Sequence, residues 1–392
     1  MKRIYIFTGK GGVGKSSVAA AHAIKSAQDG MKTLLISTDM AHNLGDIFEK
    51  KLGKNIENVL PKLDIYEIDP EYVMENDFLE FTTYLKNMLE MGMQDDQSFG
   101  MIPGMEELFS LLRISDIYQK GEYDRIIVDC APTGETLSLL KFPELLSWYM
   151  EKLFPIGKVG IRLLAPVSKK MFHVEMPNKH AVNDIEKMFL KLVELEELLK
   201  NREVTSVRIV TTPEKMVVEE TKRNYMYMNL YNFNVDGLYI NRIIPTDIGN
   251  DFFNDWIKIQ KEYISQLKES FAALPIYEIP WYDRELKGAD NIQRIVDDVL
   301  MDGDVFEAKV ITERESFSQT ETGYSLSVNI PGADKDDIDL YQASNDIVIK
   351  TGNFKRNIPL PNILRTYEVA GAKFEDGTLR IQFEKGSDED DE

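Results

Sequence analysis

Residues Gly9-Lys10-Gly11-Gly12-Val13-Gly14-Lys15-Ser16-Ser17 are the most informative stretch of this sequence. They fit the phosphate-binding pattern G-x-x-x-x-G-K-[ST] and lie between an apolar β-branched run and a run with helical spacing, as the motif requires. In such a loop, backbone N–H groups turn toward phosphate oxygens and the start of the following helix adds its positive end. We expect Lys15 to bridge the β- and γ-phosphates and Ser16 to bind Mg²⁺. The pattern therefore predicts a nucleotide site at this loop.

Two acidic residues follow predicted strands further along the chain. Asp39 comes just after a β-branched run, and Asp129 ends the apolar run 126–128. An apolar strand that ends in Asp is typical of the acid that holds a Mg²⁺-bound water beside such a loop. The two acids, together with the loop, predict hydrolysis of a nucleoside triphosphate.

The first two-thirds of the chain alternates short β-branched runs with helical patterns, which predicts an α/β fold with a mostly parallel sheet. The expected strands are 4–8, 33–37, 64–68, 125–129, 207–211 and 237–241. Two long intervals, about 70–120 and 140–200, show helical spacing only. We interpret them as a helical subdomain inserted into one P-loop NTPase domain, residues 1–300.

The last quarter of the chain has a different character. Residues 301–392 contain 20 acidic and 10 basic side chains, so they carry half of the net charge of −20. After an expected linker, 301–312, the pattern changes to short alternating strands and turns. The prediction is a small all-β sandwich over 313–385, followed by an acidic tail, 386–392, of the kind that is usually solvated.

Composition narrows the classes of protein. The chain has 392 residues with 66 acidic and 46 basic side chains, so it lacks the charge of a nucleic-acid binder and no nucleic acid partner is expected. Its one cysteine, Cys130, allows no intrachain disulfide and suits a reducing compartment. With neither a separate leader pattern nor 18 consecutive apolar residues, the expected location is cytoplasmic.

The extra lysine in the loop, Lys10, makes this motif similar to the deviant Walker A sequence. Together with the segments Ser37 to Asn43 and Asp129 to Thr136, it resembles the ArsA/Get family of ATPases over about residues 1–300. That family includes the arsenite-pump ATPase and the factor that guides tail-anchored membrane proteins. The resemblance implies ATP as the nucleotide, Mg²⁺ as the metal and a homodimer.

By position, the resemblance makes Lys10 a lysine that reaches nucleotide bound by the partner subunit. Asp39 would orient or deprotonate the attacking water, and Asn43 would be a switch-I contact. Three further residues match family positions that contact the nucleotide: Glu214, Asn241 and Pro280. For these three, ordinary loop and turn chemistry is the alternative.

Departures from the family pattern also carry information. Met40 replaces the usual Pro, and Glu135 stands where the targeting members commonly have His. With Cys130 alone, neither the cysteine cluster of the metalloid pumps nor the zinc-binding cysteine pair of the targeting factors is present, so no zinc is expected.

The C-terminal module resembles an α-crystallin domain, the sandwich of small heat-shock proteins. The matching segments are Val328 to Gly332 and Ala372 to Ile381. A generic docking sandwich is the alternative. Because every expected catalytic residue precedes the module, we expect a chain without residues 305–392 to keep hydrolysing ATP.

Two functions remain open. One is an ATP-driven homodimer that binds an apolar client helix or membrane-protein segment, with a membrane receptor as a further partner. Ten of the 17 methionines lie between Met74 and Met188, as on surfaces that repack around apolar partners, although a methionine-containing core is equally consistent. The other is an ATPase subunit that energises a membrane anion or metalloid transporter.

Overall fold

The structure is a computed structural model, and its contacts divide the chain into two compact units. One contains Met1–Thr8, Lys15–Thr205 and Glu285–Leu300, and the other contains Gly9–Gly14, Ser206–Arg284 and Met301–Glu392. The residues that the structure describes are 2–39, 43–77, 105–130, 191, 193–301, 304–307, 314–343, 346–352, 354–364 and 366–385.

Five neighbouring strands form the sheet of the first unit, in the order β3-β4-β2-β5-β1. They are β1 (Arg3–Thr8), β2 (Thr33–Ser37), β3 (Glu57–Leu60), β4 (Leu63–Glu67) and β5 (Arg125–Asp129). Only β3 is antiparallel to its neighbour. All residues of β1 and β2 are buried, which explains why these strands are continuous apolar runs in the sequence.

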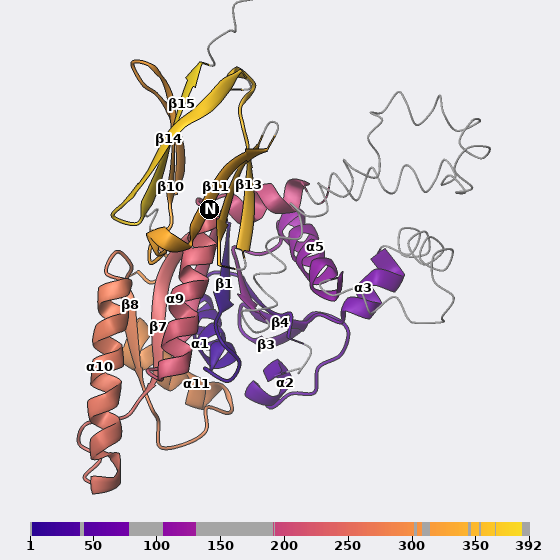
Figure 1. Ribbon diagram of the computed structural model, residues 1–392. Coiled ribbons are helices and arrows are strands. Elements are labelled where there is room, and N and C mark those ends of the chain that lie inside the picture. The colour runs from indigo at the N-terminus through magenta and orange to yellow at the C-terminus, as the bar shows by residue number, and fades with distance from the viewer. Residues whose placement is uncertain are drawn as a thin grey trace, which may run out of the picture. The chain divides into compact units, whose positions relative to one another are not determined.

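The helices of the first unit frame this sheet (Figure 1). They are α1 (Lys15–Gln28), α2 (Asn43–Ile47), α3 (Pro70–Asp77), α5 (Met105–Lys120) and α11 (Ala289–Ile295), which continues into a π-helical turn, Val296–Leu300. Residues 193–200 are also helical. Helix α1 packs on β2 and β5 and against α11, to which it is joined by a 2.7 Å hydrogen bond from Gln28 Nε2 to Gln293 Oε1.

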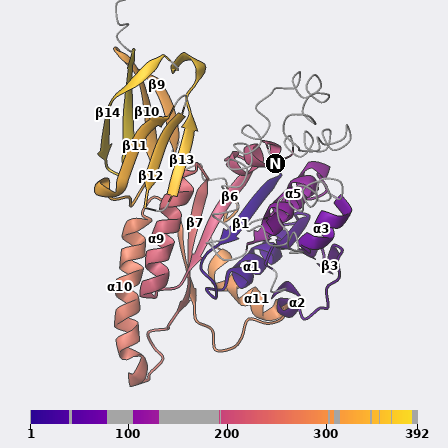
Figure 2. The same ribbon diagram turned by 45° about the vertical axis from the view of Figure 1, so that its right-hand side comes forward.

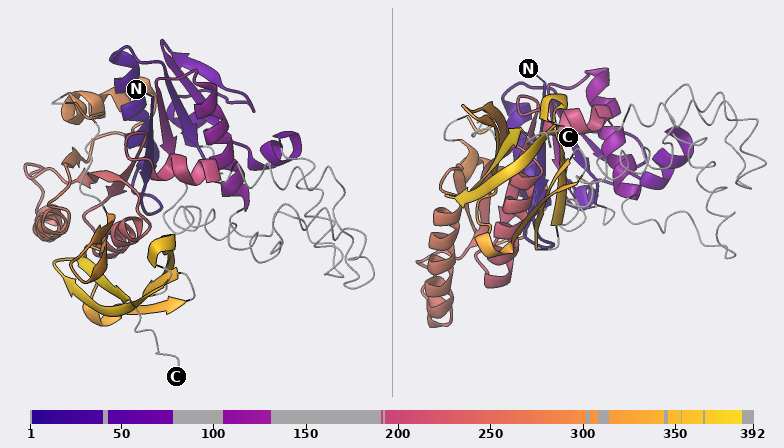
Figure 3. Two further views of the ribbon diagram at one scale, coloured as in Figure 1. Left: turned by 90° about the horizontal axis from the view of Figure 1, so that it is seen from above. Right: turned by 45° about the horizontal axis from the view of Figure 1, so that its top comes forward.

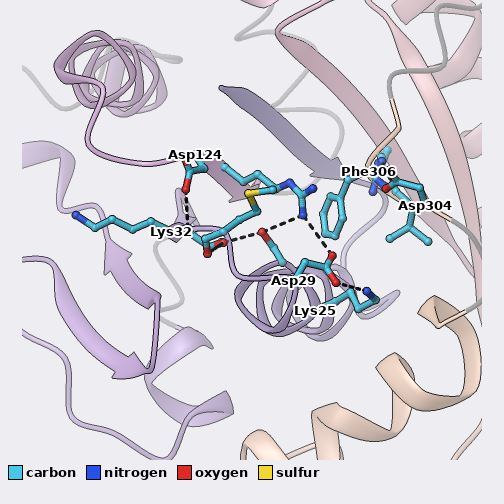
Figure 4. A network of polar contacts seen from close by, with 12 residues as sticks. Lys25, Asp29, Lys32, Asp124, Asp304 and Phe306 are labelled. Atoms are coloured by element: carbon cyan, nitrogen blue, oxygen red, sulfur yellow. Dashed lines mark hydrogen bonds and ion pairs between the residues drawn. The ribbon is translucent and has the colours of Figure 1, made fainter. Parts of the chain in front are cut away.

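A polar network closes the end of α1 where the chain turns into β2 (Figure 4). Lys25 pairs with Asp29 one turn later, and Arg125 Nη1 lies 3.5 Å from the same carboxylate. The backbone N–H of Lys32 donates to Asp124 Oδ2 at 2.8 Å. These bonds satisfy polar groups at the end of the sheet that carries no predicted nucleotide-binding residue.

The second unit adds three parallel strands, β6 (Thr205–Thr211), β7 (Val235–Ile243) and β8 (Ile276–Pro280). Helix α9 (Lys215–Leu230) joins β6 to β7, and α10 (Asn254–Ser270) follows a short 3₁₀ turn, Asp251–Phe253. The views of Figure 3 show α9 and α10 side by side. β6 and β7 are each followed by a helix that returns the chain to the start of the next strand, the arrangement expected of a parallel sheet.

The C-terminal module consists of two antiparallel sheets (Figure 2). The sheet orders are β14-β15-β10-β9 and β11-β12-β13. The strands are β9 (Glu315–Gln319), β10 (Gly323–Asn329), β11 (Ile338–Ala343), β12 (Asp346–Thr351), β13 (Phe354–Pro359), β14 (Tyr367–Glu375) and β15 (Thr378–Lys385), with 3₁₀ turns at Lys335–Asp337 and Asn362–Leu364. Leu326 of β10 pairs with Ile381 of β15, and both are fully buried.

The predicted fold class, a mostly parallel α/β sheet followed by an all-β region, is confirmed. The helical insert is described only at α3, α5 and residues 193–200, so the rest of it lies outside the described residues, and the domain boundaries stay predictions. In the expected linker, Val305 and Phe306 are buried. Within the ranges described above, no helix combines the length and apolar character needed to cross a membrane.

Candidate nucleotide site

Within the second unit, residues 9–14 of the phosphate-binding loop pack closely on strands β6 and β7 at two glycines. A Cβ on Gly9 would lie 2.1 Å from the carbonyl oxygen of Val210, at the end of β6. Gly14 has φ +90°, and a Cβ there would lie 2.3 Å from Asn241 Nδ2. Only glycine fits both positions, since any side chain would collide with backbone or with a buried amide.

Asn241, near the end of β7, holds the phosphate-binding loop through a hydrogen bond to its backbone. Its Nδ2 donates to the carbonyl oxygen of Val13 at 2.8 Å, and its Oδ1 accepts from the N–H of Arg242 at 2.9 Å. The residue is only 4% exposed, so these bonds replace those that the amide would make to water. Asn241 thus positions the loop, a role that the sequence alone did not indicate.

Lys10 extends toward α9 within the same unit. Its Nζ lies 3.3 Å from Glu220 Oε2, and about a third of each side chain is exposed. No sequence pattern predicts this pair, because a part-exposed Glu on a helix is ordinary.

The other phosphate-site residues lie in the first unit, where α1 begins. Lys15 is buried at the first position of α1, and Ser16 follows it. Asp129, at the end of β5, is fully buried, and neither carboxylate oxygen makes a hydrogen bond of normal geometry to the described residues. A buried carboxylate left in this state is costly unless a cation joins it.

The surroundings of Asp129 fit such a cation. Burial raises the pKa of Asp129 to about 7, while the Ser16 hydroxyl and the Lys15 ammonium lower it and the Asp39 carboxylate raises it further. Oxygen ligands from a carboxylate and a hydroxyl are those that Mg²⁺ prefers. Ser16 and Asp129 are therefore suited to hold Mg²⁺, with Lys15 beside them.

Asp39 follows β2 at the same edge of the sheet as Asp129. It is half-buried, and its N–H donates to Ser37 Oγ at 3.1 Å. Asn43 begins α2, whose Gly45 N–H donates to Glu67 Oε1 at 3.0 Å. The intervening residues 40–42, which include Met40, lie outside the described residues, as does Glu135.

The remaining two predicted residues lie at the ends of elements in the second unit. Glu214 is the N-cap of α9 and its Oε1 accepts from Thr212 Oγ1 at 3.1 Å. Pro280 ends β8 and lines an open hollow of about 620 Å³, together with Ile243 of β7 and Gln260 of α10. Their contacts with a nucleotide stay predictions.

Comparison with known proteins identifies the family. Residues 2–301 match the family model described as anion-transporting ATPase, and residues 321–383 match an HSP20-like domain found in ArsA. The chain belongs to the anion-transporting ATPase family. It is an ATPase with an HSP20-like C-terminal domain, which confirms the ArsA/Get resemblance and the predicted ATP hydrolysis.

Relatives of this ATPase carry two kinds of name. A protein of Aquifex aeolicus, 31% identical with 97% of this chain and 99% of its own length covered, is named as an arsenical pump-driving ATPase, as is one of Chlorobaculum tepidum at 33% identity, covering 97% and 96%. A Paramecium tetraurelia protein named ATPase ASNA1 homolog 1 is 29% identical over 76% of this chain and 92% of its own length.

Cys130 is placed so that its thiol should be inert in the native ATPase. The side chain is 1% exposed, and burial raises the pKa of the thiol to about 12, with a further increase from the Asp129 carboxylate. Because the thiolate is the reactive form, we expect iodoacetamide to leave the native chain unmodified at mildly alkaline pH and to modify it fully in denaturant, as measured by mass spectrometry. A Ser318→Cys variant, with its new thiol at an exposed position of β9, supplies the reactive control. Rapid labelling of native Cys130 would contradict the burial.

Proposed function

We propose that this chain works in the cytoplasm as a Mg²⁺-dependent, ATP-hydrolysing homodimer that couples ATP-driven closure to binding of an apolar client segment. The observation that carries the proposal is the pair of lysines in one loop. Lys15 is buried at the start of α1, whereas Lys10 is part-exposed and pairs with Glu220 of α9. Lys15 already supplies a lysine for the phosphates of its own site, so we assign Lys10 to the phosphates of a site on another chain.

Each residue then has a distinct role. The loop N–H groups and Lys15 bind the phosphates, and Ser16 and Asp129 hold Mg²⁺, which supplies neutralisation of the phosphate charge when bound. Asp39 orients the attacking water from the end of β2. Because phosphoryl transfer depends on positioning and charge more than on covalent chemistry, these fixed groups suffice for slow hydrolysis.

The client is proposed from the similarity to the ASNA1-named relatives and from the chain's apolar features. The Met-rich stretch 74–188 lies mostly outside the described residues. Closure of two chains would bring both copies of this stretch together, and a groove formed in this way would bury an apolar helix only in the closed state. A membrane receptor is proposed as the second partner, because a client of this kind has to be passed to a bilayer.

A second candidate is an ATPase subunit that energises a membrane transporter, because several relatives are named as arsenical pump-driving ATPases. Burial of Cys130, the chain's single cysteine, argues against a metalloid version, since that thiol is not placed to bind arsenite. No three His, Cys, Asp or Glu side chains among the described residues are grouped to hold a metal ion.

A fluorescent apolar helical peptide distinguishes the two candidates. The peptide should bind the chain in Mg-ATP and dissociate in Mg-ADP, as measured by fluorescence anisotropy. A peptide of equal length with its apolar face changed to Ser and Gln is the matched control and should not bind. Equal binding with and without ATP would contradict the client proposal, and stimulation of ATP hydrolysis by arsenite would favour the transporter candidate.

A further inference from the structure

The β-sandwich supplies a hydrogen-bond donor to the C-terminal end of α9. The last four carbonyl groups of a helix lack partners within the helix and need them from elsewhere. Three of them are satisfied locally, by bonds from Tyr231 N to Tyr227 O (2.9 Å), Phe233 N to Met228 O (2.9 Å) and Asn232 N to Asn229 O (3.0 Å). The fourth, Leu230 O, accepts from Arg356 Nη1 of β13.

A second arginine of the sandwich binds the same helix end. Arg314, which precedes β9, donates from Nη1 to Asn229 Oδ1 and from Nη2 to Val235 O at 3.4 Å. Arg356 also donates to Glu315 Oε2, so its charge is balanced inside the sandwich. Cations at the C-terminal end of a helix are favourable because the helix dipole is negative there.

These contacts are buried rather than superficial. Arg314 is 3% exposed and Arg356 is 5% exposed. Tyr231 OH donates to Lys355 O at 2.9 Å, and the Tyr227 ring lies 3.5 Å from the Phe354 ring between centroids. A buried arginine that loses one partner keeps an unsatisfied charge, so this end of α9 cannot move without disrupting the sandwich contacts.

The same helix reaches the phosphate-binding loop through Glu220. Helix α9 runs from Lys215 to Leu230 without Pro or Gly, and Glu220 pairs with Lys10 at 3.3 Å. Glu220 and Leu230 are ten residue steps apart, which is about 15 Å of continuous helix. A displacement of α9 at its C-terminal end should therefore also move Glu220 relative to Lys10.

We propose that the sandwich is a positioning element of the ATPase: it fixes the C-terminal end of α9, and α9 holds Glu220 against Lys10 so that this lysine is kept from phosphate until nucleotide displaces it. The inference rests on the nucleotide site proposed above. On this proposal, a chain without residues 305–392 should still hydrolyse ATP, but with a changed KM. Residues 314–385 and α9 belong to the same compact unit.

The test is a kinetic double-mutant cycle on the full chain with Mg-ATP. Glu220→Gln should lower KM for ATP by up to about fivefold, the range for a part-exposed ion pair, with kcat within about twofold. Arg356→Met should lower KM in the same direction, and the double variant should match Glu220→Gln alone, because both changes act on one pair. Arg380→Met, which removes a similar charge from an exposed position of β15, is the control and should leave KM unchanged.

Each outcome decides the proposal. Additive effects of Arg356→Met and Glu220→Gln on KM would overturn it, as would a normal KM in Arg356→Met. If Arg356→Met does not fold, Tyr231→Phe replaces it, since this variant removes only the hydrogen bond to Lys355 O. A KM shift in Tyr231→Phe that disappears in the Glu220→Gln background supports the proposal, and an unchanged KM overturns it. Lys15→Ala should abolish ATP binding, and a normal KM there would instead contradict the nucleotide site.

Discussion

The Asp39→Asn variant should bind Mg-ATP normally and lose hydrolysis by about 10²- to 10⁴-fold, the contribution expected of one positioned base. Asn keeps the size of the side chain but cannot accept a proton from water. Asp39 follows β2 at the strand ends where Asp129 lies, and its N–H is held by Ser37 Oγ at 3.1 Å. The measurement is single-turnover hydrolysis, with ATP affinity determined by calorimetry on the same sample.

Asp255→Asn provides the control for this substitution. Its side chain is fully solvated at the start of α10 and pairs only weakly with Lys258 at 3.3 Å, so hydrolysis should stay within twofold of the unmodified chain. Normal turnover by Asp39→Asn would show that this residue does not position the attacking water.

Mixing two inactive variants should restore hydrolysis, which is the second large effect. Lys10→Ala alone should reduce hydrolysis by about 10³-fold, the scale of a cation supplied to phosphate by a partner. Its own Asp39 is intact, whereas an Asp39→Asn chain still offers Lys10. In a mixed dimer, one site therefore has both groups. If the two variants are mixed in equal amounts and pair at random, half of the dimers contain one chain of each. Each of these mixed dimers has one working site out of two, so the mixture should show about a quarter of the unmodified activity.

The opposite result is equally clear. If Lys10 acts on the nucleotide of its own chain, neither site of the mixed dimer has both groups and mixing restores nothing. Lys258→Ala, which removes an exposed lysine of α10, is the control and should hydrolyse ATP normally with or without mixing.

Six of the strands were predicted from sequence because each is a β-branched run bounded by polar residues. The structure extends three of them, β1 back to Arg3, β6 back to Thr205 and β7 to Val235–Ile243, and shifts the expected strand 64–68 by one residue to Leu63–Glu67. It adds β3 and β8, which the sequence did not indicate. Residues 57–60 are only partly buried at an antiparallel edge, and Tyr277 and Glu278 of β8 are likewise not fully buried. At such edges the apolar periodicity weakens, and the signal for a strand weakens with it.

Some residues of the candidate site can likewise be predicted from the sequence, and others cannot. The phosphate-binding motif predicts Gly14, Lys15 and Ser16 as site residues, because backbone geometry and phosphate chemistry restrict which residues can occupy those positions. No local sequence pattern predicts the contacts of Glu220 or Arg356. Arg356 meets its helix partner Leu230 from 126 positions away in the chain. Such contacts arise from tertiary packing and become visible only once the fold is known.

The most direct test of the account is the mass in solution of the Asp39→Asn chain held with Mg-ATP, measured by light scattering. ATP that is bound but not hydrolysed should keep two chains closed together, so we expect twice 45.0 kDa. A mass of 45.0 kDa, at a concentration where the unmodified chain hydrolyses ATP, would show that one chain is sufficient and would contradict the proposed dimer.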